Sequence, residues 1–296
     1  MKQLGIKPLA LSIAAIPLAA LLFAITLTPR HAHGQASDIP SAAPTQPAGM
    51  TQEQRGRLLL DQMVIALGGD AWLNRKDMTI LGRTAAFFRG APNGSVVDYS
   101  AHFRFAASNL PPAERIGFIT DKSMLFPGKK IDVVQIYTAG EGYEVTYKGR
   151  TALPKDITED YFRRRNHSLD SVVRDWLKQP GVISIAEGTL MIERHLADQV
   201  TVLTANNDAV TIALDSSSHL PLRRTFQWRN TQFKDHDEDS EDYDDYHTIQ
   251  GLPTALRITR YHNGDMASQR YLTKVEYNTN LGPDLFNPDN LLKKKQ

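Results

Sequence analysis

An acidic run between Asp235 and Asp245 is the part of the sequence whose residue types could most readily do chemistry. It holds eight carboxylates in eleven residues. Carboxylate oxygens are the ligands that Ca²⁺ prefers, but the run lacks the central glycine and the distant glutamate of an EF-hand loop. We therefore favour a solvated loop that leads into an edge strand, where charges discourage edge-to-edge aggregation. Calcium binding by the run is an open alternative.

Other signatures of catalysis are missing from the sequence. Because the chain has no cysteine, it has neither a thiol nucleophile nor a cysteine metal site. It also has no Gly-x-Ser-x-Gly elbow, no phosphate-binding glycine loop and no His-Glu-x-x-His zinc helix. His102, Asp98 and the acidic run are the only material for a hydrolase with an unrecognised site, and their spacing forms no triad. We predict no catalytic residue, no metal ligand and no cofactor.

Three consecutive arginines, Arg163, Arg164 and Arg165, form a basic cluster. Most such runs are solvated helix faces. The functional alternative is that they contact anionic headgroups or an acidic partner.

The elements that must position these side chains are mainly strands. In residues 97–105, Val97, Tyr99, Ala101, Phe103 and Phe105 alternate with polar residues. A period of two predicts a strand with one apolar face that is shielded from water, which we call its dry face. Similar strands recur from about residue 78 to residue 277, joined by tight turns such as the one at 263–264. The sequence therefore predicts a large antiparallel sheet whose dry face must be covered.

Aromatic side chains alternate out of several of these strands. They more often form core than a pocket, but a large curved sheet with few helices can leave part of its concave face unfilled. Our candidate cavity-lining residues are Tyr99, Phe103, Phe105, Phe118, Tyr143, Val145, Tyr147, Phe226 and Trp228.

Helical spacing occurs in two places. Leu59, Leu60, Met63, Val64 and Leu67 predict an amphipathic helix that begins near residue 51 and ends at two glycines. A helical insert is predicted at 155–179, where the apolar spacing after residue 168 is the strongest helix signal in the chain. The predicted class is α+β, mainly β: an incomplete barrel whose concave face is covered by the N-terminal helix and the insert.

The N-terminal segment resembles an export signal. Lys2 and Lys7 precede an apolar stretch from Leu9 to Leu27, and a small-x-small site ends at Ala36. We expect a signal peptide at 1–36, a disordered linker at 37–50 and one domain at 51–296. An uncleaved inner-membrane anchor is the alternative, because the apolar stretch approaches the length of a membrane span.

Without residues 1–36, the chain carries 31 basic and 33 acidic side chains, which argues against nucleic-acid binding.

The order of the predicted helices and strands along the chain resembles that of the LolA/LolB-like lipoprotein carrier superfamily, including its lipoprotein-sorting protein branch. The residues that carry the resemblance are the helix ending in Gly68 and Gly69, the meander, and a closing strand followed by Pro283, Phe286 and Pro288. The resemblance implies an incomplete barrel whose apolar concave face receives acyl chains. It transfers no individual contact residue.

We therefore expect a periplasmic, non-enzymatic binder or carrier of a hydrophobic ligand such as a lipid or a lipoprotein acyl chain. Its candidate partners are that ligand and an envelope protein, with membrane contact through the N-terminal segment. The first alternative is an envelope interaction or sensor module without lipid cargo. The second is the hydrolase with an unrecognised site.

Overall fold

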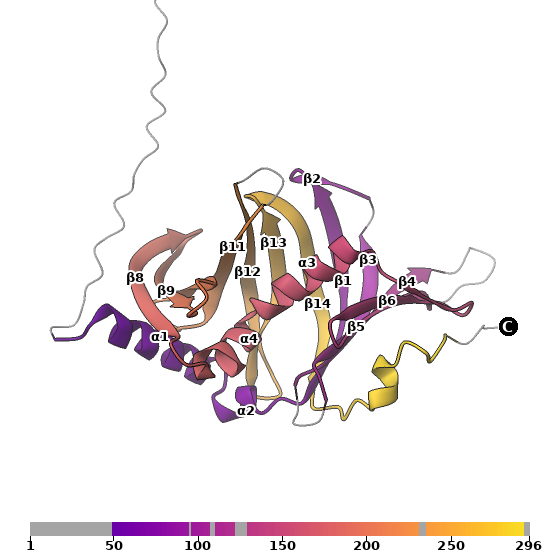
Figure 1. The fold of residues 1–296 in the computed structure, drawn as a ribbon, viewed down its shortest axis with the longest axis horizontal. Helices are drawn as coiled ribbons and strands as arrows, with labels where there is room; N and C mark the ends of the chain where they lie inside the picture. The colour runs from indigo at the N-terminus through magenta and orange to yellow at the C-terminus, as the bar shows by residue number, and fades with distance from the viewer. Residues whose placement is uncertain (1–48, 95, 107–109, 122–128, 231–234, 293–296) are drawn as a thin grey trace, which may run out of the picture. The chain divides into compact units, whose positions relative to one another are not determined.

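A computed structural model describes residues 49–94, 96–106, 110–121, 129–230 and 235–292 (Figure 1). The expected signal peptide and most of the expected linker lie outside the described residues. None of the helices within the described residues combines the length and the apolarity that crossing a bilayer requires.

The described strands form one antiparallel sheet in the order β7-β6-β5-β4-β3-β1-β14-β13-β12-β11-β10-β9-β8, with β2 paired on β1. The strands that precede the helical insert are β1 (Asp77–Phe88), β2 (Ala91–Pro92), β3 (Val97–Arg104), β4 (Ala113–Asp121), β5 (Lys129–Thr138), β6 (Glu141–Val145) and β7 (Arg150–Ala152). Those that follow it are β8 (Ile183–Ile192), β9 (His195–Leu203), β10 (Ala209–Asp215), β11 (Pro221–Arg229), β12 (His236–Ile249), β13 (Leu252–His262) and β14 (Asp265–Tyr277).

The sheet is open, because β7 and β8 end the strand order and do not pair with each other. Two meanders meet in its middle, where the first strand pairs with the last. Met78 of β1 lies opposite Tyr277 of β14, and the pairing continues to Ala86 and Ser268. The predicted fold class, a large curved antiparallel sheet with covering helices, is confirmed (Figure 1).

Helix α1 (Gln52–Ala66) packs against β8 and β9 at one end of the sheet (Figure 1). Leu59, Leu60 and Met63 are buried in the main core. The helix approaches the sheet so closely at Gly56 that an added Cβ would lie 2.5 Å from the backbone oxygen of Ser184. A short helix, α2 (Asp70–Leu73), follows and buries Trp72.

The helical insert forms α3 (Lys155–Asn166), α4 (Leu169–Arg174) and a 3₁₀ turn, Trp176–Lys178. Figure 1 shows α3 and α4 crossing in front of the sheet. The two helices differ in depth: Val172 of α4 is fully buried, whereas α3 has no fully buried residue among those described. α4 therefore completes the core, and α3 lies over it as a cover.

One sequence interpretation was wrong. The acidic run is not a loop before an edge strand; from His236 onward it belongs to β12, which lies between β11 and β13 inside the sheet. Its inward-facing carboxylates, Asp239 and Glu241, are tolerated there because arginines of β11, β13 and β14 pair with them, as described below. Strand β8 has an irregularity between Ala186 and Gly188.

Candidate functional site

A pocket of about 270 Å³ lies between the insert helices and the sheet. Strands β1 and β3 form one side of it, and β12, β13 and β14 form another. Helices α3 and α4 contribute further residues, and β4, β11, α2 and the segments beside α2 contribute a few more. The pocket volume lies near the lower end of the roughly 300–1,000 Å³ that is usual for ligand sites. The apolar and aromatic part of the wall consists of Leu67, Trp72, Met78, Ile80, Ala101, Phe103, Phe105, Leu169, Tyr246, Pro253, Ala255, Ile258, Leu272 and Tyr277.

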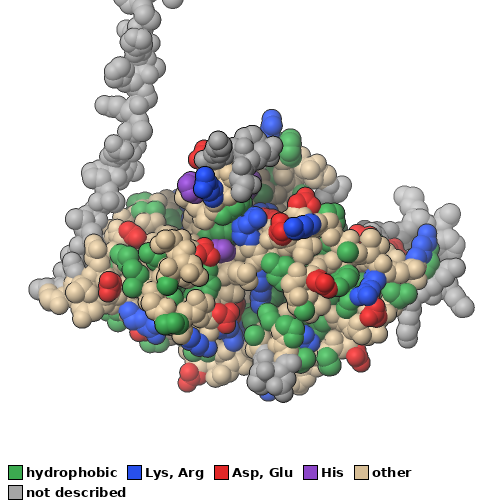
Figure 2. Space-filling model, in the orientation of Figure 1, with side chains coloured by type: hydrophobic (Ala, Val, Ile, Leu, Met, Phe, Trp, Pro, Cys, Tyr) green, Lys and Arg blue, Asp and Glu red, His purple; other side chains and the backbone are tan. Residues whose placement is uncertain are grey.

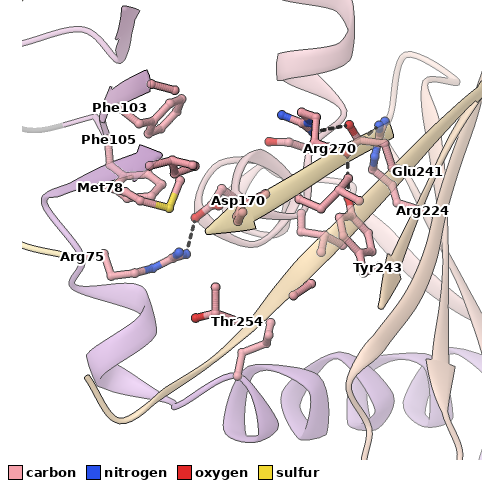
Figure 3. Close-up of a pocket in the computed structure, with 18 of the residues that line it drawn as sticks. Arg75, Met78, Phe103, Phe105, Asp170, Arg224, Glu241, Tyr243, Thr254 and Arg270 are labelled. Carbon is pink, nitrogen blue, oxygen red and sulfur yellow. Dashed lines mark hydrogen bonds and ion pairs between the residues drawn. The ribbon is translucent and has the colours of Figure 1, made fainter. Parts of the chain in front are cut away.

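One end of the pocket carries a charged cluster around Glu241 of β12 (Figure 3). Its carboxylate lies 3.2 Å from Nη2 of Arg224 and 3.0 Å from Nη2 of Arg270, and Tyr243 donates a hydrogen bond to it at 3.1 Å. Burial by itself would raise the pKa of Glu241, but the charges of Arg224, Arg270 and Arg164 outweigh it and lower the pKa to about 2. Glu241 is therefore ionised at any physiological pH.

These ion pairs continue as one connected set, which we call the arginine network. Glu241 joins Arg224 and Arg270; Asp239 joins Arg224 and Arg260; Asp160 joins Arg260, Arg163 and Arg164. Five arginines thus share three carboxylates, which leaves a formal charge of +2. Burial raises the pKa of Asp239, while Arg260 and Arg224 oppose that rise.

The other end of the pocket is organised by Arg75 (Figure 3). Its guanidinium donates to Asp170 of α4 at 2.8 Å and to the backbone oxygen of Trp72 at 2.8 Å. It also lies 4.6 Å from the ring centre of Trp72 and 4.8 Å from that of Phe105. Burial lowers the pKa of Arg75, and Asp170 opposes this. These contacts hold α2, α4 and Phe105, the residue that follows β3, together beside the apolar wall.

A second hollow of about 690 Å³ adjoins the pocket, since Arg75 and Phe105 line both. Its lining comes mainly from connecting segments, 73–77 and 280–283, and is rich in polar side chains. The smaller pocket is the better candidate site because it lies between the helices and the dry face of the sheet.

The structure distributes the predicted cavity residues over three places. Phe103 and Phe105 line the pocket. Tyr99 and Phe226 are buried in the main core, with Phe118 and Trp228 packed partly buried against it. The remaining three lie elsewhere in the sheet: Val145 is fully buried in a separate cluster, against which Tyr143 packs, and Tyr147 is exposed.

The three consecutive arginines turn toward the protein rather than forming a fully solvated face. Arg165 lies over Phe103, 3.8 Å from its ring centre, and Arg163 lies 4.6 Å from that of Trp228. Arg164 and Arg165 line the pocket. In the orientation of Figure 1, Figure 2 shows basic and acidic side chains side by side among hydrophobic ones on the face that α3 crosses.

The residues considered for a hydrolase, His102, Asp98 and the acidic run, do not form a common site. Nδ1 of His102 lies 3.3 Å from Oγ1 of Thr79, and burial lowers the pKa of this imidazole. Asp98 pairs with Arg83 at 3.0 Å. Within the described residues, no group of three or more His, Cys, Asp or Glu side chains has the geometry to hold a metal ion.

Sequence reasoning missed the charged lining of the pocket, Arg224, Glu241 and Arg270. A signal was present for the first of these. Arg224 stands two residues before Phe226, so period-two alternation places it on the buried face of β11. An arginine on the apolar, inward-facing side of a strand indicates that it has a buried partner of opposite charge. The identity of that partner depends on which strand lies alongside.

The fold is shared with solved structures of very different sequence. A DUF1329 family protein from Desulfovibrio piger aligns with a TM-score of 0.54 at 10% identity, over 82% of this chain and 100% of that one. A domain described as that of an outer membrane lipoprotein-sorting protein, from Vibrio parahaemolyticus, aligns with a TM-score of 0.50 at 9% identity, over 79% and 97%. No protein-family model and no curated protein matches the sequence. The structural likenesses confirm the fold that the resemblance implied.

Proposed function

We propose that this chain, with its LolA-like fold, is a non-enzymatic binder or carrier of a hydrophobic ligand such as a lipid or a lipoprotein acyl chain. The observation that carries the proposal is the unfilled apolar pocket between the insert helices and the dry face of the sheet. Burying apolar ligand surface there contributes about 25 cal/mol per Å² before the costs of association. The size of the pocket favours a slender ligand, such as a single acyl chain.

We also propose that the protein acts after export, in the periplasm or on the outer side of the inner membrane. The support for this location is the basic start and the apolar stretch from Leu9 to Leu27. A periplasmic carrier would take its ligand from one membrane or protein and release it to another, so the ligand must be able to leave the pocket.

The test is native mass spectrometry of the full chain purified from the periplasmic fraction, followed by identification of any bound molecule. A fluorescent fatty acid is then titrated into the delipidated protein. We expect a co-purifying lipid and saturable uptake of the probe. A uniformly ligand-free mass together with no uptake would overturn the proposal, and a stoichiometric protein partner without lipid would favour the interaction module.

Substitution inside the pocket links uptake to this site. Ala255 lines the pocket, so Ala255→Phe should fill part of it and weaken uptake of the probe by about tenfold or more. The matched control is Ala152→Phe, which adds the same ring at an exposed position on β7. Equal uptake by the two variants and the unaltered protein would place the ligand elsewhere.

A further inference from the structure

The pocket combines an apolar wall with an unbalanced set of charges. The arginine network has a formal charge of +2, and two further charged residues in the lining, Arg165 and Glu114, cancel each other. At the other end, Asp170 pairs both with Arg75 and with Arg174, which lies outside the lining of this pocket. Arg224 is withdrawn from water and the other four arginine side chains are 19–36% exposed, so an anion bound here would compensate partly desolvated positive charge. Among the described residues that line the pocket, no further acidic side chain supplies that anion.

Two guanidinium groups in the network retain hydrogen-bonding capacity. Arg224 is 1% exposed, and its Nε is buried without a hydrogen-bond partner among the described residues. Arg270 is partly exposed and forms one ion pair within the described part of the chain, to Glu241. Because a guanidinium has five N–H donors in a planar fork, both groups can still donate to an oxyanion.

We propose that the ligand is a single-chain amphiphile with an anionic head, a carboxylate or a phosphate, and that this head is bound by Arg270, Arg224 and Arg164. This inference rests on the proposed function and specifies its ligand class. All three arginines line the pocket, and their charges converge on the Glu241 carboxylate. A carboxylate head would lower the formal charge of the arginine network from +2 to +1, and a doubly ionised phosphate would lower it to zero, while the tail lies along the apolar wall.

The chemistry of the two pocket ends supports this orientation. Guanidinium forks bind carboxylate and phosphate oxygens with paired, charge-assisted hydrogen bonds. Beyond the network, the apolar side chains of Met78, Phe103, Phe105 and Leu272 line the wall beside the Arg75–Asp170 ion pair. Figure 3 shows Arg224, Glu241 and Arg270 gathered at one side of the pocket, with Met78 and the two phenylalanines at the opposite side.

The test compares ligands that differ only in the head. Palmitate, hexadecyl phosphate, hexadecanol and hexadecylamine compete with a neutral fluorescent probe for the delipidated full chain at about pH 8, where the acids are ionised. We expect the two anions to bind about tenfold or more tightly than the alcohol and the amine to bind weakest. Inorganic phosphate alone is the fifth ligand and should not displace the probe, because it lacks the tail.

Variants assign the head preference to the network. Arg270→Gln should reduce the affinity for palmitate about tenfold and leave the affinity for hexadecanol nearly unchanged. Arg270→Lys retains the charge and should recover part of the loss. The matched control is Arg257→Gln on the adjacent strand β13, whose side chain is 44% exposed and paired with Asp244. This control should behave like the unaltered protein toward every ligand.

The outcomes separate this inference from the function it rests on. If the delipidated protein binds neither the neutral probe nor any hexadecyl compound, the hydrophobic-binder function itself fails. If all four bind equally, or if Arg270→Gln weakens palmitate and hexadecanol alike, the binder stands and the anionic-head inference is overturned. If inorganic phosphate alone displaces the probe at concentrations comparable to hexadecyl phosphate, the site recognises a free anion and the amphiphile inference is overturned.

Discussion

The guanidinium of Arg224 and the carboxylate of Asp239 meet at 3.4 Å between β11 and β12, with the two side chains 1% and 0% exposed. Arg224 also pairs with Glu241, two residues further along β12. These contacts place two carboxylates of the acidic run against a single buried arginine. The inward-facing charges of β12 are therefore internal counter-ions, which explains how a strongly acidic segment lies in the middle of a sheet.

Arg224→Met should destabilise the protein by about 3–5 kcal/mol, because it leaves buried carboxylates without their shared cation. Urea unfolding measures the difference. The control is Arg83→Met, which removes an ion pair whose arginine is 63% exposed, and it should cost at most about 1 kcal/mol. Equal effects of the two substitutions would mean that the buried pair stabilises no more than a surface pair does.

Glu241→Gln should remove an acid-dependent part of the stability. The pKa of Glu241 is about 2 in the folded protein against its usual 4.5, so its contribution is fully present above pH 4.5 and disappears as the pH falls toward 2. The difference in unfolding free energy between the unaltered protein and Glu241→Gln should be about 3 kcal/mol near neutral pH and shrink toward zero at about pH 2. The substitution also removes the Glu241 charge that helps to raise the pKa of Asp239, so the difference includes a smaller change of opposite sign from Asp239.

Urea unfolding at a series of pH values measures that difference. Glu187→Gln, at an exposed position on β8, is the control and should follow the unaltered protein at every pH. A constant gap between Glu241→Gln and the unaltered protein from neutral pH to pH 2 would contradict the depressed pKa.

Tyr161→Ala should loosen the cover that α3 forms over the pocket. The Tyr161 ring stacks on Tyr137 with ring centres 3.6 Å apart, and its hydroxyl donates to Glu114 at 2.6 Å. Losing both contacts should speed amide hydrogen exchange throughout α3 and shorten the residence time of a bound fluorescent fatty acid. Hydrogen-exchange mass spectrometry and stopped-flow release measure the two effects.

Lys155→Ala is the control for this prediction, because Lys155 belongs to the same helix and its side chain is 88% exposed. It should leave both rates unchanged. If Tyr161→Ala also leaves them unchanged, α3 is held by other contacts and does not control access to the pocket.

Local patterns were sufficient to predict most of the elements. The alternation at residues 97–105 predicted β3, and the spacing of Leu59, Leu60 and Met63 predicted α1, because side-chain periodicity depends on the backbone of one segment. The insert helices followed from the same reasoning. Local pattern gave the wrong prediction for the acidic run. Its eight carboxylates suggest solvent when considered alone, but two of them, Asp239 and Glu241, face the interior, where Arg224, Arg260 and Arg270 pair with them.

The sequence by itself therefore determined the class of the fold, an antiparallel sheet covered by an N-terminal helix and an insert. Only the tertiary structure decided where its charges meet. Arg164, Arg224, Glu241 and Arg270 are distant in the chain and come together because β11, β12, β13 and β14 are consecutive in the sheet and α3 crosses their face. Such a site depends on pairing between segments that are distant in the sequence. Its net charge is therefore set by which side chains the folded protein brings together.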